Sequence, residues 1–93
     1  MKPPRNLVGP TISRLRNGKG LSQPQFAAIF QRQGWDMSRE VLAQIETGRR
    51  RLTDFEVVFI ARCLKIPVTD LFPKIGLTQQ VDDLIQRAER SME

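Results

Sequence analysis

Residues 37–51, MSREVLAQIETGRRR, constrain the fold more than any other part of the chain. At helical spacing this stretch divides into an apolar face and a polar face, which is the pattern of a helix packed by one side on a core. The apolar face carries Val41, Leu42 and Ile45, and the polar face carries Arg39, Glu40, Ala43, Gln44 and Thr47. The sequence therefore predicts an amphipathic helix over residues 38–47.

Both ends of this helix are marked. Ser38 is a preferred N-cap residue, and Glu40 falls in the first turn, where the helix dipole favours a carboxylate. Gly48 suits the left-handed residue that ends many helices. Three arginines follow immediately and are called the arginine run here: Arg49, Arg50 and Arg51.

The polar face has the chemistry needed to read base pairs. An arginine such as Arg39 can bond guanine, Gln44 can bond adenine, and Glu40 can accept from cytosine. The arginine run that follows is suited to phosphates. Two alternatives stay open: an ordinary surface helix with solvated charges, and a Glu40 that serves only the helix dipole or orients Arg39.

Composition restricts the other possibilities. With 93 residues, 40% of them apolar, the chain is expected to form one small domain. One cysteine excludes an intrachain disulfide and suits a reducing cytosol, and one thiol without histidine makes a metal site unlikely. We find no signal peptide, and the longest apolar run, 57–61, is too short to cross a bilayer, so we expect a cytoplasmic, nucleoid-associated protein without membrane contact.

The charge is unevenly distributed along the chain. The net charge is +5, but residues 1–53 hold 10 lysines and arginines against 3 acidic residues, whereas residues 54–93 hold 5 against 7. A basic half beside a mildly acidic half indicates a side that faces a polyanion, and we interpret this as nucleic acid.

Caps and apolar spacing predict an all-α chain. Capping boxes begin helices at Ser22, with Gln25, and at Thr53, with Glu56. Helices are expected over residues 9–18, 22–33, 38–47, 53–64 and 67–72, with a last helix over 78–91. Cys63 is expected to be a small core residue.

The two ends of the chain flank this predicted domain of residues 8–73. Residues 1–7 are expected to form a flexible arm, either disordered or loosely docked, which we interpret as a plain terminus in preference to a DNA-contacting arm. Residues 74–93 form an added helix with an apolar stripe. It either packs on the surface of the fourth helix around Val58 and Phe59 or pairs with a second copy, and the dimer is favoured. The stripe contains Leu77, Val81, Leu84, Ile85 and Ala88.

The segments GPTISRLRNGKGLSQPQFA and SREVLAQIETGRRRLTDFEVVFIARCLKIPVTDLF resemble the Cro/phage-repressor (Xre-type) helix-turn-helix family over about residues 8–72. The specific marks are the L-S-Q opening of the second helix, the I-E-x-G-x-R end of the third and the I-A-x-x-L-x-I-x-x-x-x-L-F close. The resemblance implies a five-helix bundle whose second and third helices form the helix-turn-helix. It also implies that the third helix enters the major groove.

The resemblance also implies roles for individual residues. Gln23 matches a position that contacts the DNA backbone or an outer base, although it could be only a polar residue at a helix start. Arg16 and Glu46 match a pair that bridges helices one and three; we interpret both as structural, because an unpaired buried carboxylate is costly. The base-reading positions are Arg39, Glu40 and Gln44, and the backbone-contacting positions are Gln23, Ser38, Thr47, Arg49, Arg50 and Arg51.

One departure from the family pattern is clear. Between Ala27 and Glu46 the chain is about five residues longer, and residues 31–35 account for the difference. We expect a longer second helix and a longer turn, with Trp35 packed against the core in preference to stacking on a base.

The sequence thus predicts a sequence-specific regulator of transcription that binds double-stranded DNA as a homodimer on a palindrome. We find no catalytic constellation and expect no enzyme activity, cofactor, metal or small-molecule substrate. The alternative is a protein-interaction adaptor or antitoxin component on the same fold. An RNA-binding protein is less favoured, because exposed aromatic residues are missing unless Trp35 is exposed.

Overall fold

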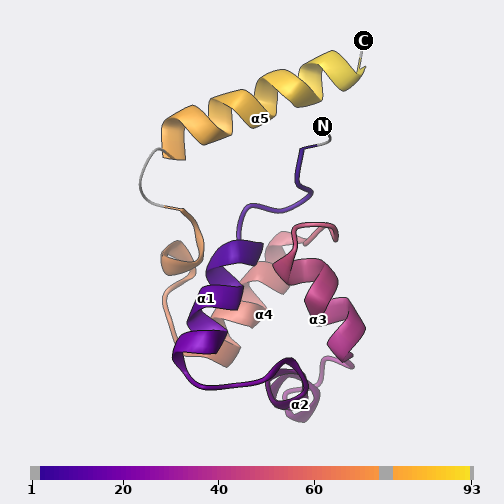
Figure 1. Ribbon diagram of the computed structural model, residues 1–93, viewed down its shortest axis with the longest axis vertical. Coiled ribbons are helices and arrows are strands. Elements are labelled where there is room, and N and C mark those ends of the chain that lie inside the picture. Colours follow the sequence, from indigo (N-terminus) through magenta and orange to yellow (C-terminus); the bar gives the residue numbers. More distant parts are fainter. Residues whose placement is uncertain (1–2, 74–76, 93) are drawn as a thin grey trace.

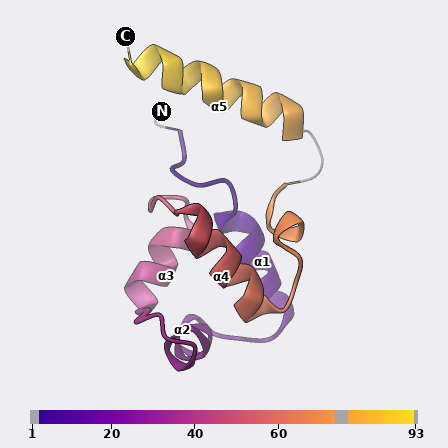
Figure 2. The same ribbon diagram turned by 180° about the vertical axis from the view of Figure 1, so that it is seen from behind.

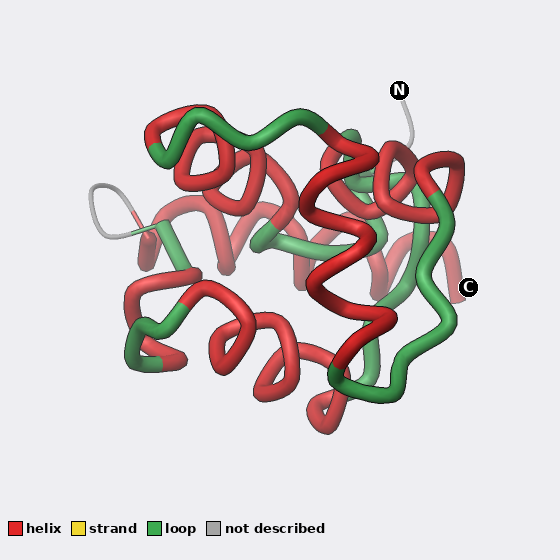
Figure 3. The backbone as a smooth tube through the Cα atoms, turned by 90° about the horizontal axis from the view of Figure 1, so that it is seen from below, coloured by secondary structure: helices red, strands yellow, loops and turns green. Residues whose placement is uncertain are grey.

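The computed structural model describes residues 3–73 and 77–92, and its helices are joined by loops (Figure 1; Figure 3). Within those residues no strand is present, and the predicted all-α class is confirmed. The helices are α1 (Gly9–Gly18), α2 (Gln23–Arg32), α3 (Arg39–Glu46), α4 (Asp54–Leu64), the 3₁₀ helix η1 (Val68–Leu71) and α5 (Leu77–Met92).

Both predicted capping boxes are present. The Ser22 hydroxyl accepts from the Gln25 N–H at 3.2 Å, while the Gln25 side chain accepts from the Ser22 N–H at 2.8 Å. Thr53 and Glu56 make the same reciprocal pair at 3.1 and 2.9 Å. Each box satisfies two N–H groups that the first helical turn leaves without intrahelical partners, so α2 and α4 begin where the sequence predicts.

The core lies where α1, α2, α3 and α4 meet. Every helix of this group contributes side chains that are almost completely shielded from solvent, and η1 adds one more. Together with Val8 before α1 and Met37 in the α2–α3 turn, the largest fully buried side chains are Ile12, Phe26, Phe30, Leu42, Ile45, Ile60, Leu64 and Leu71. Cys63 is also buried, as expected, and burial raises the pKa of its thiol to about 11.

The turn between α2 and α3 is long but well packed. Gly34 stops α2 with a positive φ of 100°, and the Trp35 N–H then donates to the Phe30 carbonyl at 3.1 Å. The Trp35 ring lies edge-on to Phe30 and to Phe59, with centroid distances of 5.5 Å in both cases. The predicted longer turn and the packing of Trp35 on the core are therefore confirmed.

The fifth helix differs from its prediction. The sequence indicated one and a half helical turns over residues 67–72, but η1 is a single 3₁₀ turn of four residues. Proline supplies its N-cap position at Pro67 and also follows it at Pro73. Pro73 cannot donate the backbone hydrogen bond that a longer helix would need, so the helix stays short.

Of the two expectations for the N-terminal arm, disordered or loosely docked, the inner part of the arm shows docking. The Arg5 N–H donates to the Gly48 carbonyl at 2.8 Å, and the Asn6 side chain bonds the end of α3. Residues 1–2 lie outside the described residues. The segment of residues 3–6, called the N-terminal segment from here on, is thus docked on the domain.

The last helix does not pack on α4. In Figure 1 and Figure 2, α5 lies beyond the N-terminal segment, on the far side from α4. Val58 on α4 is 51% exposed and Ile85 on α5 is 50% exposed, so the predicted packing of this helix around Val58 in the same chain is wrong. Leu84 is partly buried, whereas the side chains of Leu77 and Val81 lie outside the described ones. No helix in the described ranges is both long and apolar enough to span a membrane.

Candidate nucleic-acid interface

The outer face of α3 is open to solvent. Arg39, Glu40 and Gln44 are exposed, and within the described residues none of their side chains has a hydrogen bond or ion pair. On the opposite face, Leu42 and Ile45 are fully buried. The core therefore holds α3 by one side and presents the three predicted base-reading side chains together on the other.

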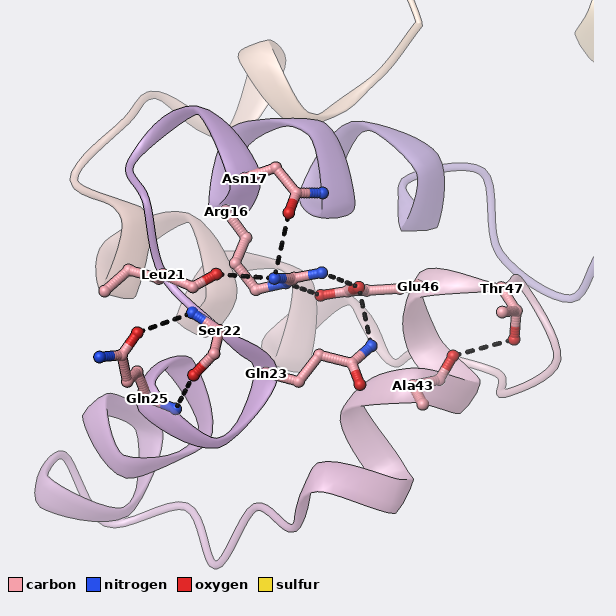
Figure 4. Close-up of polar contacts among 9 residues, drawn as sticks. All are labelled: Arg16, Asn17, Leu21, Ser22, Gln23, Gln25, Ala43, Glu46 and Thr47. Carbon is pink, nitrogen blue, oxygen red and sulfur yellow. Dashed lines mark hydrogen bonds and ion pairs between the residues drawn. The ribbon is translucent and has the colours of Figure 1, made fainter.

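Two of the predicted backbone-contacting hydroxyls are used by α3 itself. Ser38 is the N-cap, and its hydroxyl accepts from the Val41 N–H at 3.1 Å. The Thr47 hydroxyl donates to the Ala43 carbonyl at 2.9 Å, as Figure 4 shows. A phosphate can only accept hydrogen bonds, so the Thr47 hydroxyl would have to release the Ala43 carbonyl before it could donate to one. The Ser38 hydroxyl acts only as an acceptor in its cap, so its proton is still available for a phosphate.

A buried ion pair joins α3 to α1. Arg16 Nε lies 2.7 Å from Glu46 Oε2 and Arg16 Nη2 lies 3.0 Å from Glu46 Oε1, which is a two-pronged contact (Figure 4). Arg16 Nη1 also donates to the Leu21 carbonyl at 2.7 Å. The hydrogen bond with Glu46 raises the pKa of Arg16 although burial acts in the opposite direction. The structure thus contains the pair expected from the sequence, and Arg16 connects α3 to the loop before α2.

Gln23 completes this network instead of pointing outward. Its Nε2 donates to Glu46 Oε1 at 3.1 Å, so the same carboxylate holds a guanidinium from α1 and an amide from α2 (Figure 4). Within the described residues no buried side-chain nitrogen or oxygen lacks a partner. If Gln23 contacts the DNA backbone as expected, it does so with an amide that is already bonded to Glu46.

The arginine run divides into two kinds of side chain. Arg49 and Arg51 are exposed and have no side-chain partner in the described part of the chain. Arg50 instead lies 3.3 Å from Glu56 Oε2, and its guanidinium carbon is 5.9 Å from the centre of the Trp35 ring. Arg50 thus connects the loop to α4 and the α2–α3 turn, so its expected phosphate contact competes with an intramolecular one.

Asn6 is a contributor that the sequence reasoning missed. Its Nδ2 donates to the Ile45 carbonyl at 3.1 Å and to the Arg50 carbonyl at 2.8 Å, and its Oδ1 accepts from the Gly9 N–H at 2.7 Å. The last bond is local and typical of asparagine before a helix. The first two cross about forty positions of the chain, and no local pattern predicts them.

One expectation about aromatic residues is wrong. The sequence suggested that Trp35 was the one candidate for an exposed aromatic side chain, yet Phe55 is 76% exposed. It borders a shallow groove that also includes Trp35, Asp36, Glu56 and Phe59. The residues that line this groove include two carboxylates and no cation, so the exposure of Phe55 does not by itself favour RNA binding.

Comparison with known proteins identifies the family to which the chain belongs. Residues 12–71 match the family model HTH_3, described as helix-turn-helix. These residues contain α1 from Ile12 onward and all of α2, α3, α4 and η1. No curated protein matches the chain.

A solved structure is also similar to this chain. It is the high-resolution crystal structure of the restriction-modification controller protein C.AhdI from Aeromonas hydrophila. The two chains share 28% identity with a TM-score of 0.60, and the match covers 70% of this chain and 87% of that one.

Both matches agree with the structure, in which α3 has an exposed polar face and a buried connection to α1 and α2. The chain is a DNA-binding regulator of transcription, and it belongs to the HTH_3 helix-turn-helix family of Xre/Cro type.

Proposed function

We propose that this protein binds specific sites in double-stranded DNA and reads the major groove with α3. The observation that carries the proposal is the outer face of α3, where Arg39, Glu40 and Gln44 lie exposed without intramolecular side-chain partners in the described residues. Arginine and glutamine each make two-pronged contacts with a purine edge, and glutamate accepts from cytosine. The likeness to a restriction-modification controller protein supports a regulatory role.

Affinity in this proposal comes mainly from phosphate contacts. Arg49 and Arg51 extend from the loop that follows α3 and are exposed, so they are the phosphate-binding members of the arginine run. Ser38 would donate its hydroxyl proton to a phosphate at the other end of α3, since its oxygen already caps the helix. Gln23 would contact the backbone only through the part of its amide that Glu46 does not hold.

Selection of bound sequences from random duplex DNA tests the proposal. The selected duplex should bind Arg39→Ala and Gln44→Ala more weakly by about 1–3 kcal/mol each, while a scrambled duplex should lose much less. Lys65→Ala is the control, because it removes an exposed cation at the end of α4 farthest from the arginine run. If selection enriches no sequence, or if both duplexes lose affinity equally, specific reading by α3 is rejected.

We also propose that the protein acts as a homodimer. Phe55 and Val58 on α4 and Ile85 on α5 leave large apolar side chains in water, and burying them between two copies would be favourable. One helix-turn-helix domain reads only a short half-site, so a two-fold dimer on a palindrome doubles the contacts. The same exposed apolar side chains would also favour a protein-interaction adaptor. Selection from random duplex DNA distinguishes a DNA-binding homodimer from an adaptor, because an adaptor has no preferred DNA site.

A further inference from the structure

The N-terminal segment lies along the C-terminal end of the recognition helix (Figure 1; Figure 2). Three hydrogen bonds hold it there: the Arg5 N–H to the Gly48 carbonyl at 2.8 Å, and Asn6 Nδ2 to the carbonyls of Ile45 and Arg50 at 3.1 and 2.8 Å. The last carbonyls of a helix have no intrahelical partner. Asn6 therefore bonds one of the last carbonyls of α3, and Arg5 and Asn6 together hold the loop that follows the helix.

Close packing at Gly48 supports the same arrangement. Gly48 is buried and has a φ of +77°, a conformation that favours glycine. A Cβ at this position would lie 3.2 Å from the Cβ of Pro4. The N-terminal segment thus covers the glycine that ends α3, and a side chain on that glycine would push the segment away.

This docking brings Arg5 to the edge of the proposed DNA-binding surface. A shallow groove of about 580 Å³, called the Arg5 groove here, runs between the N-terminal segment and the end of α3. Arg5 is exposed and, within the described residues, has no side-chain partner. The groove is lined by Pro3, Pro4, Arg5, Gln44, Thr47, Gly48 and Arg49.

The charges around this groove indicate an anionic occupant. Arg5 and Arg49 line it together, and no carboxylate lines it. Two cations held near each other without an anion repel, and a phosphate between them relieves that repulsion. Gln44 also lines the groove, so such a phosphate belongs to the duplex whose bases α3 would read.

We propose that Arg5 binds a DNA phosphate and that Asn6 positions it by docking the N-terminal segment on α3. The interpretation of residues 1–7 as a plain terminus is thereby reversed for Arg5. The proposal rests on the proposed DNA-binding function and extends the phosphate-binding surface from the arginine run to a part of the chain before α1.

The salt dependence of binding tests the contact. Each phosphate contact releases counterions and contributes about 0.9 to the slope of log affinity against log salt. Arg5→Gln should lower that slope by about 0.9, so its loss of affinity should be about 3.5-fold greater at 50 mM than at 200 mM salt. The loss should be equal on selected and scrambled duplexes, since a phosphate carries no sequence information. Arg5→Lys should keep the slope, and Lys65→Gln, the control, should change nothing.

A second variant tests the positioning by Asn6. Asn6→Ala removes the bond to the Ile45 carbonyl of α3, the bond to the Arg50 carbonyl in the following loop and the bond from the Gly9 N–H, but it leaves Arg5 in place. It should lower the slope nearly as much as Arg5→Gln does. The double variant Asn6→Ala with Arg5→Gln should then have nearly the same salt slope as Asn6→Ala alone. Circular dichroism at the binding temperature shows whether Asn6→Ala remains folded, and Arg5→Gln, whose side chain is exposed, carries the test if it does not.

The outcomes separate this inference from the proposed function. If the wild-type protein binds DNA with a steep salt dependence but Arg5→Gln has the same slope, the Arg5 contact is rejected and the proposed function stands. A loss confined to the selected duplex would also overturn the phosphate contact. If Arg5→Gln and Asn6→Ala lower the slope additively, the positioning role is rejected. If the wild-type protein binds no DNA, both proposals fail.

Discussion

Glu46 accepts hydrogen bonds from Arg16 on α1 and Gln23 on α2, so a single carboxylate connects α3 to two other helices. The Arg16 and Glu46 side chains are 10% and 5% exposed. Charges this deeply buried are tolerated only in pairs, and a partner left alone is costly.

We predict that Arg16→Ala and Glu46→Ala each lower the free energy of unfolding by about 3–5 kcal/mol. The double substitution to methionine and leucine, Arg16→Met with Glu46→Leu, should cost much less than the sum, because neither charge remains unpaired. Urea denaturation of the three variants measures this. Single variants within a few tenths of a kcal/mol of wild type would contradict a buried pair.

The arginine run offers a second prediction at single side chains. Replacing Arg49 and Arg51 together with glutamine should lower the salt slope of DNA binding by about 1.8, because two phosphate contacts are lost. Arg50→Gln should change that slope little. It should instead lower stability by up to about 1 kcal/mol, since its half-exposed ion pair with Glu56 and its contact with Trp35 are lost.

Salt titrations and thermal melts of the two variants distinguish these roles. If Arg50→Gln flattens the slope as much as one of the exposed arginines does, its guanidinium leaves Glu56 when DNA binds.

Cys63 gives a prediction about pH. Burial raises the pKa of its thiol from 9.0 to about 11, so the unfolded chain loses this proton at a lower pH than the folded one. The unfolded state therefore binds fewer protons between these values, and stability falls as the pH rises from about 9 towards 11. The difference in unfolding free energy between wild type and Cys63→Ala should shrink from pH 8.5 to pH 10.5. A difference that stays constant would mean that the thiol is not shielded.

The approach of α1 to α3 is determined by a glycine. A Cβ on Gly9 would overlap the carbonyl oxygens of Ile45 and Glu46, whereas a Cβ on Gly18, at the other end of α1, would meet nothing within 4 Å. The first turn of α1 therefore rests directly on the backbone at the end of α3, next to the carbonyls that Asn6 caps.

We predict that Gly9→Ala lowers the free energy of unfolding by about 1–3 kcal/mol, because α1 must move away from α3. Gly18→Ala is the matched control in the same helix, and it should be neutral or stabilise by up to about 1 kcal/mol, since alanine favours the helix. Chemical denaturation of both variants is the measurement. Equal effects would show that the contact at Gly9 yields easily.

At the scale of the whole chain, large apolar side chains are exposed both on α4 and on α5. Phe55 is 76% exposed, and Val58 and Ile85 are about half exposed. We predict that the full chain sediments as a dimer at micromolar concentration, whereas Phe55→Ser with Val58→Ser, and a chain ending at Pro73, sediment as monomers. Lys65→Ser, a change at the exposed end of α4, should leave the dimer intact. If the wild-type chain is a monomer at these concentrations, the prediction of a dimer in free solution is wrong, and dimerisation can occur only on DNA.

Local chemistry was sufficient to predict the helices and most of their boundaries. Ser22 with Gln25 and Thr53 with Glu56 start helices through bonds between residues three positions apart, and Gly34 and Gly48 stop helices through their own backbone conformation. The outer face of α3 was predictable for the same reason, because helical periodicity alone separates Gln44 from Leu42.

Contacts between distant parts of the chain were beyond such reasoning. Three contacts depend on how the helices pack. The amide of Gln23 bonds Glu46, Arg50 bonds Glu56, and Asn6 bonds carbonyls about forty positions away. These side chains are polar and have several possible partners, so only the tertiary arrangement decides which partner each one meets. The docking of Arg5 beside the recognition helix follows from that arrangement, because it is the folded end of α3 that offers the carbonyls on which the N-terminal segment rests.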